Sequence, residues 1–177
     1  MAAVASAGAY LAERGNSTPS SERYGQLPTW LPKAKLHVGR LVTATTAQPR
    51  LAVQGDTVSV RLPHGRVLAT LVGPVVPEEG EFPVPKTSRC TFTVTFASAS
   101  GVVPLGRRAF TIVDELGHIH DPAVTARGGG PVPARVLPGR TVTLTITDVL
   151  PTGDGGVRWS PEGAKPIVAW DFDVEID

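Results

Sequence analysis

The chain has 177 residues and a mass of 18.5 kDa, which corresponds to about one domain with room for a terminal extension. An apolar fraction of 41% is sufficient for a hydrophobic core and excludes a chain that is disordered throughout. The formal net charge of +1, without any run of like charges, argues against nucleic acid or an anionic membrane surface as a partner.

Turn-forming residues are abundant, with 19 glycines and 17 prolines, and threonine alternates with apolar residues in several segments. Many turns between short β-branched runs indicate an all-β sandwich or barrel. The single cysteine, Cys90, excludes an intrachain disulfide bond and the ligand spacing of a zinc finger. A lone cysteine beside a strand is usually a small buried hydrophobic residue, and we expect that role for Cys90.

The N-terminal part differs from the rest in composition. Residues 2–12 are apolar but too short to span a bilayer, which requires about 20 residues. They have two open interpretations, the end of an export or anchor segment that begins upstream, or a disordered alanine-rich terminus. Residues 13–29 have the composition of a flexible linker. We therefore expect an apolar stub and linker over residues 1–29 and a folded domain over residues 30–177.

Period-two alternation predicts strands in the folded part. The clearest is Cys90–Ala97, where Phe92, Val94 and Phe96 share one face. The other predicted strands lie at 57–62, 67–72, 141–147, 157–159 and 167–177, with two more within 109–121. Residues 74–88 are rich in proline and glutamate and predict a loop that passes from one sheet to the other. Seven to eight strands without an amphipathic helix predict an immunoglobulin-like antiparallel β-sandwich behind a disordered N-terminal tail.

The last predicted strand has two contrasting faces. Trp170 and Phe172 lie on the face that we expect to be buried. Four carboxylates occupy the other face, Asp171, Asp173, Glu175 and Asp177. A calcium ion binds through such oxygen atoms, but neighbouring carboxylates on one strand face stand roughly 7 Å apart. A solvated acidic face that discourages edge pairing is the preferred interpretation.

The run from Thr57 to Glu175 contains short motifs that together resemble a known family. They are Phe92–Phe96, Phe110–Asp114 followed by Gly117, Pro138–Val142, Val157–Trp159 and Ala169–Trp170. Similar motifs occur in the immunoglobulin-like domains of unknown function in bacterial exported proteins and lipoproteins, to which the secreted mycobacterial immunogenic-protein sandwich is related. The resemblance implies a sandwich fold and a location outside the cytoplasm, and it brings no catalytic motif. The chain departs from the pattern at His120, where similar domains place an aromatic residue.

Residues 109–121 hold the densest group of candidate metal ligands, in particular Asp114, His118 and His120. Two histidines separated by one residue on a strand project from the same face, which is compatible with a shared metal ion. A metal site also needs a third or fourth ligand. Asp114, Asp121, His37 and His64 are the candidates for these additional ligands, and we predict Asp114 as the third member of such a site.

The turn of this hairpin decides where the histidines point. A two-residue loop, Glu115-Leu116, places both histidines on the outer face. A three-residue loop that ends in a left-handed Gly117 pairs Asp114 with His118 and turns the histidines toward the core face. The glycine favours the three-residue loop, with His120 at the rim of the core.

No catalytic motif is present. The chain lacks a Gly-x-Ser-x-Gly motif, and Cys90 has no recognisable partner histidine, so we predict no enzymatic activity and no cofactor. We expect an exported or surface-displayed module, secreted or membrane-anchored, that binds an unknown protein or cell-envelope component and not nucleic acid. The alternative is a small exported copper- or zinc-binding protein that uses His118-Ile119-His120.

Overall fold

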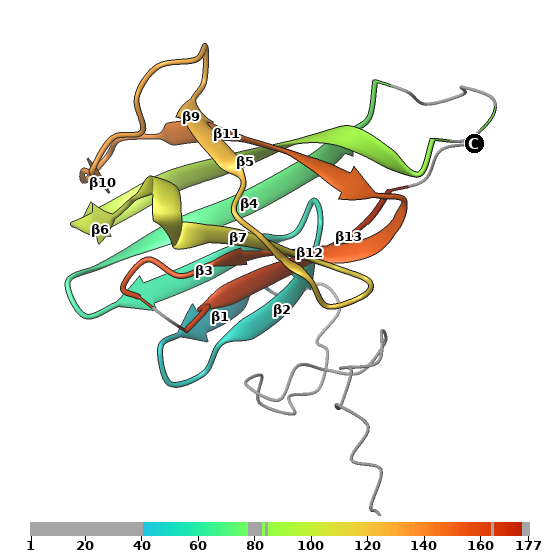
Figure 1. Ribbon diagram of the computed structural model, residues 1–177. Helices are drawn as coiled ribbons and strands as arrows, with labels where there is room; N and C mark the ends of the chain where they lie inside the picture. The colour runs from blue at the N-terminus through green and yellow to red at the C-terminus, as the bar shows by residue number, and fades with distance from the viewer. Residues whose placement is uncertain (1–40, 78–82, 84, 164, 175–177) are drawn as a thin grey trace, which may run out of the picture.

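The computed structural model describes residues 41–77, 83, 85–163 and 165–174. The predicted N-terminal tail and the predicted boundary between residues 29 and 30 lie outside this part. The described residues form thirteen strands and one short 3-10 helix (Figure 1). These elements are β1 (Val42–Thr45), β2 (Arg50–Val53), β3 (Thr57–Leu62), β4 (Gly65–Val75), β5 (Thr87–Gly101), β6 (Val103–Pro104), η1 (Arg107–Ala109), β7 (Phe110–Asp114), β8 (Ile119–His120), β9 (Ala123–Ala126), β10 (Arg135–Val136), β11 (Val142–Pro151), β12 (Gly153–Trp159) and β13 (Val168–Val174).

Two sheets pack face to face. One has six strands in the order β1-β3-β4-β5-β11-β9, and the other has five in the order β2-β13-β12-β7-β8. A short antiparallel pair, β10-β6, lies beside them. The predicted all-β sandwich is confirmed. The strands outnumber the predicted seven to eight because short segments, including β1, β2, β6 and β10, pair along the margins of the sheets. Within the described part, no helix is long and apolar enough to cross a membrane.

The chain changes sheets at both margins of the sandwich. β1 pairs with β3 in the first sheet, and the next strand, β2, pairs with β13 in the second sheet. At the other margin, β8 pairs with β7, and β9 then joins β11. The β1-β3 and β2-β13 pairs are parallel, whereas the other described strand pairs are antiparallel, so the antiparallel prediction holds except at this margin. Short strands that change sheets leave little free edge for pairing with another chain.

The predicted passage between sheets at residues 74–88 is wrong. β4 and β5 are direct antiparallel neighbours in the six-stranded sheet, with Leu71 opposite Val94 and Val75 opposite Thr91. The connecting segment therefore returns to the same sheet. The predicted loop was also too long, because β4 includes Pro74 and Val75 and β5 includes Thr87 and Ser88. The proline content of the segment contained no information about which sheet the chain joins next.

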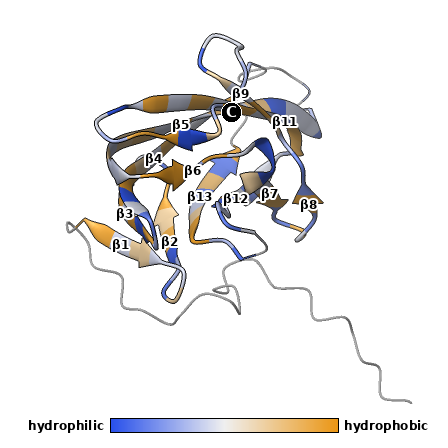
Figure 2. Ribbon diagram, turned by 90° about the vertical axis from the view of Figure 1, so that its left-hand side faces the viewer, coloured by the Kyte–Doolittle hydropathy of each residue, from blue (hydrophilic) through white to orange (hydrophobic). Residues whose placement is uncertain are grey.

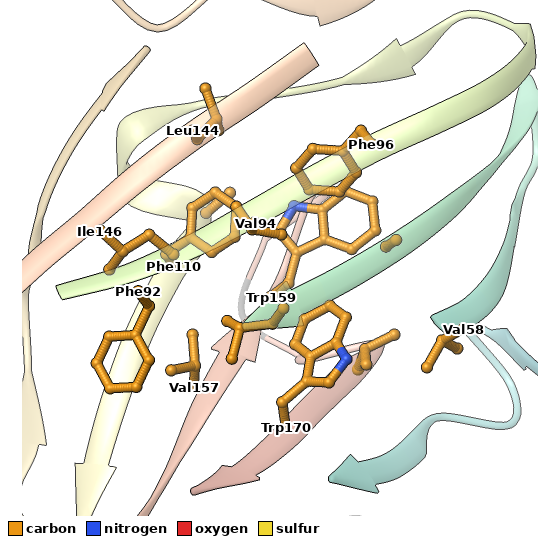
Figure 3. Packing of buried hydrophobic residues seen from close by; sticks show 14 of the residues in the cluster. Val58, Phe92, Val94, Phe96, Phe110, Leu144, Ile146, Val157, Trp159 and Trp170 are labelled. Carbon is orange, nitrogen blue, oxygen red and sulfur yellow. The ribbon is translucent and has the colours of Figure 1, made fainter. Parts of the chain in front are cut away.

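The core lies between the sheets and is rich in aromatic rings (Figure 3). Phe92, Val94 and Phe96 of β5 are fully buried, as their alternation with threonine predicts. The ring centre of Phe96 lies 4.7 Å from that of Trp159 on the opposite sheet, and Phe92 lies 4.7 Å from Phe172. Each of these contacts joins the two layers directly. Cys90 is buried in the same core, in agreement with its predicted role.

Candidate functional site

The β7-β8 hairpin has the three-residue loop that Gly117 predicts. Ile112 lies opposite His120, and Val113 lies opposite Ile119. The next pair closes the loop, because the Asp114 N–H donates a hydrogen bond to the His118 carbonyl over 3.2 Å. Gly117 has a φ of 84°, a conformation that glycine adopts without the steric cost of a side chain. This register turns both histidines toward the face of Asp114, at the rim of the sandwich.

The carboxylate of Asp114 binds four donors. Its Oδ1 accepts hydrogen bonds from the backbone N–H groups of Leu116 (3.0 Å) and His118 (2.8 Å). Its Oδ2 lies 3.0 Å from Nδ1 of His118 and 3.1 Å from Nε2 of His120. An ionised carboxylate only accepts hydrogen bonds, so both ring nitrogens act as donors in this arrangement. The Asp114 side chain is 5% exposed, whereas that of His118 is 69% exposed.

These contacts lower the pKa of Asp114. Burial raises the pKa, but the hydrogen bonds from the His120 side chain and from the backbone and side chain of His118, with the charge of His118, outweigh that effect. The pKa of the carboxyl group therefore lies below its usual 3.8. The ionised form is the one that the folded hairpin stabilises.

The three predicted metal ligands thus come together, but as a hydrogen-bonded cluster. Across the described ranges, no group of three or more His, Cys, Asp or Glu side chains has the arrangement that holds a metal ion. The rings of His118 and His120 approach one oxygen atom of Asp114 as donors. His64 lies in the turn between β3 and β4, and His37 lies outside the described residues.

The acidic row of the last strand lies on the outer face of the five-stranded sheet. Asp173 is opposite Asp154 of β12, and Asp171 is opposite Gly156. Partial burial raises the pKa of Asp171, and the charges of Asp154 and Asp173 raise it further. Asp173 is exposed and Asp171 is partly buried, so of the two described carboxylates the predicted solvated face holds for Asp173. Glu175 and Asp177 lie outside the described residues.

A second surface feature was not predicted. Seven of the ten described arginines are exposed and belong to segments that meet at one end of the sandwich. This end carries the β3-β4 turn, β6 and β10, and it lies at the left of Figure 1 and faces the viewer in Figure 2. We call this the arginine end, and it consists of Arg61, Arg66, Arg107, Arg108, Arg127, Arg135 and Arg140. These residues belong to four separate stretches of the chain. Because no two of the stretches are adjacent in the sequence, no basic run signals them.

Backbone hydrogen bonds between loops bring these stretches together. The Val102 N–H donates to the His64 carbonyl over 2.9 Å, which ties the end of β5 to the β3-β4 turn. The Leu105 N–H donates to the Ala134 carbonyl over 2.9 Å, and the Gly139 N–H donates to the Ala99 carbonyl over 3.1 Å. Together these bonds place the β3-β4 turn, η1 and the connection from β9 to β11 at the same end.

The arginine end carries almost no compensating charge. In the part of the chain that the structure describes, the ion pairs are those of Asp114 with His118 and His120, and none includes an arginine of this end. One acidic residue, Glu162, lies in a loop that reaches this end, since the Ser160 N–H in the same loop donates to the Ala109 carbonyl over 2.7 Å. Lys165 in that loop offsets its charge.

Carboxylates collect at the opposite end of the strands. Glu115 lies against Gly153 at the start of β12, next to the Asp154-Asp173 pair. Asp114 at the end of β7 is opposite Gly155. The net charge of +1 therefore conceals a separation of positive and negative charge along the sandwich.

Comparison with known proteins gives one structural match. No protein-family description matches the chain, and no curated protein matches it in sequence. The crystal structure of MPT63, a secreted protein from Mycobacterium tuberculosis, aligns with a TM-score of 0.45 and 18% sequence identity. The alignment covers 72% of this chain and 100% of that chain. The chain is thus similar in structure to a secreted mycobacterial β-sandwich protein, at a distance that transfers no function.

Proposed function

We propose that this chain is a non-enzymatic binding module that acts outside the cytoplasm and contacts an anionic component of the cell envelope through its arginine end. The observation that carries the proposal is the group of seven exposed arginines without an ion-pair partner among the described residues. Arginine presents a planar set of donors that matches carboxylate and phosphate groups. A surface that carries charge of one sign also attracts partners of opposite charge over a distance.

The extracytoplasmic location has a separate basis. It rests on the apolar stub at residues 2–12, on the linker that follows it, and on the sequence resemblance to exported immunoglobulin-like domains, to which we propose that the chain belongs. Fractionation of cells that express the untagged protein tests this location. Recovery in the cytoplasmic fraction alone would contradict it.

Neutralising part of the arginine end is expected to abolish retention of envelope components. The double variant R135Q/R140Q removes two positive charges from this end. The matched control K86Q/R89Q removes two exposed positive charges at the other end of β5. Immobilised wild-type protein and the control should retain the same components from an envelope extract at moderate salt. R135Q/R140Q should lose them, because salt weakens each contact between exposed charges and this variant lacks two of the positive charges of this end. Equal retention by all three proteins would rule out this surface.

A metal-binding role is the second candidate, and the observation that favours it is the approach of two imidazoles to one oxygen atom of Asp114. The distances of 3.0 and 3.1 Å are near the separation of about 3.3 Å between two ligands of a tetrahedral zinc ion, whose bonds are about 2.0–2.1 Å long. The backbone N–H groups that donate to Oδ1 fix the orientation of the carboxylate, as hydrogen bonds to the ligands do in metal sites. A zinc or copper ion would take the place of the two ring protons.

The metal candidate predicts that H118A weakens zinc or copper binding at least tenfold, because one ligand is lost. Because the His118 side chain is exposed, this substitution is expected to change the stability of the fold little. The control is H64A, which removes a turn histidine far from the hairpin. Titration calorimetry and melting temperature of tag-free protein with each metal provide the measurement. Equal affinity in H118A and the wild type would exclude this site.

A further inference from the structure

We propose that the arginine end docks on the surface of an anionic lipid bilayer. This inference rests on the proposed function and names the partner of the same surface. The evidence beyond charge is a pair of exposed aliphatic residues within the arginine end, Leu137 and Val102, which are 48% and 39% exposed.

The fold places these two aliphatic residues next to each other. In the β10-β6 pair, Arg135 is opposite Pro104 and Val136 is opposite Val103. Val102 directly precedes Val103 and Leu137 directly follows Val136, so both lie at the same end of this pair. Their neighbours Val136 and Val103 are fully buried, so the core holds the backbone that presents them. Both residues therefore directly flank an anchored pair of short strands.

This combination matches the chemistry of a membrane interface. Aliphatic side chains partition to the boundary between headgroups and acyl chains. Arginine side chains reach phosphate groups at the headgroup level while their methylene groups remain in apolar surroundings. Each arginine near an anionic leaflet strengthens binding about fivefold, the equivalent of about 1 kcal/mol. The arginines and the two aliphatic residues at this end of the sandwich provide both kinds of contact.

Nucleic acid fits the same surface less well. Binding of single strands relies on aromatic side chains on which bases stack. Every phenylalanine and tryptophan that the structure describes is buried. Reading of a duplex groove requires an inserted helix or β-ribbon, whereas the arginine end presents turns, a three-residue 3-10 helix and two-residue strands.

The test is co-sedimentation of the full untagged chain with vesicles of phosphatidylcholine alone or of equal parts phosphatidylcholine and phosphatidylglycerol. The expected result is binding to the phosphatidylglycerol vesicles that raised salt abolishes, with no binding to pure phosphatidylcholine. The quadruple variant R107Q/R108Q/R135Q/R140Q should bind at least tenfold more weakly. L137N should also bind more weakly although it leaves the charge unchanged. R135Q/R140Q should lose more affinity than the charge-matched control K86Q/R89Q.

Several outcomes would overturn the inference. The quadruple variant leaves residues 1–40 intact, so undiminished binding by that variant would assign membrane contact to the apolar N-terminal stub. Failure of the wild type to bind either vesicle would also overturn it. Binding to a DNA duplex or single strand in the absence of vesicle binding would replace lipid by nucleic acid. If the protein does not bind vesicles but still retains envelope components through its arginines, the lipid inference is wrong and the proposed function stands. Melting temperatures equal to that of the wild type confirm that each variant is folded.

Discussion

Replacing Trp159 with alanine is expected to lower the free energy of unfolding by about 3–5 kcal/mol. The indole is fully buried, and its ring centre lies 4.7 Å from that of Phe96 and 6.5 Å from that of Phe110. The contact with Phe96 joins the two sheets, so its loss leaves a cavity at the centre of the sandwich (Figure 3). Domains of this size are stabilised by about 5–15 kcal/mol in total. Urea denaturation followed by circular dichroism measures the change.

Two further variants serve as controls for this prediction. W159F is expected to lose less stability, because it retains an aromatic ring and removes an indole N–H that has no hydrogen-bond partner in the described structure. V149A changes a residue that is 50% exposed and should stay within about 0.5 kcal/mol of the wild type. A stability of W159A within the same range as V149A would contradict the central role of the indole.

Replacing Asp114 with alanine is expected to lower the free energy of unfolding by about 2–3 kcal/mol at neutral pH. The change removes the acceptor for the backbone N–H groups of Leu116 and His118 and for both histidine rings. The loop then loses the contacts that hold it in the three-residue form. D114N retains the shape of the side chain but not its charge, so it should have an intermediate stability. Urea denaturation of the three proteins provides the comparison.

The contribution of Asp114 should also depend on pH in a defined direction. Its pKa is below the usual 3.8 in the folded state, so the ionised carboxylate favours folding. The stabilisation is fully present above 3.8 and is lost as the pH falls through the lower folded pKa. The difference between wild type and D114N should therefore shrink in that acidic range.

A neighbouring carboxylate provides the matched control. E115Q removes the same charge from the same loop at an exposed position and should change stability by no more than about 0.5 kcal/mol. Identical pH dependence in D114N and E115Q would show that the hydrogen bonds to Asp114 contribute no specific stability.

The strand faces and the hairpin turn follow from local sequence. Alternation of Phe92, Val94 and Phe96 with threonine predicts which side of β5 is buried, because side chains on a strand point to opposite faces in turn. Gly117 predicts the three-residue loop, because a left-handed residue in that position costs little only for glycine. The meeting of Asp114 with both histidines follows from that register. The hydrogen bonds from both histidine rings to one oxygen atom of Asp114 were not predicted. The spacing of these residues in the sequence is the same whether the rings donate to the carboxylate or all three side chains bind a metal ion.

The partners of the strands could not be predicted in the same way. Residues 74–88 indicate a loop, but its sequence holds no signal for a return to the same sheet. At one margin β1 pairs in parallel with β3, and β2 pairs in parallel with β13. These pairs likewise depend on where β3 and β13 lie after folding. Pairing is a long-range property, and the period of two is the same for a strand in either sheet.

The sequence by itself determined an all-β sandwich, the buried faces of its strands, and the turn that brings Asp114 to His118, because these depend on residues that are close in the chain. Only the tertiary structure decided the charge pattern. The overall charge of +1 and the absence of a basic run argued against an anionic partner. Long-range contacts between loops then gathered arginines from four separate stretches at one end and left carboxylates at the other. Electrostatic attraction depends on distance in space, and sequence separation does not measure that distance.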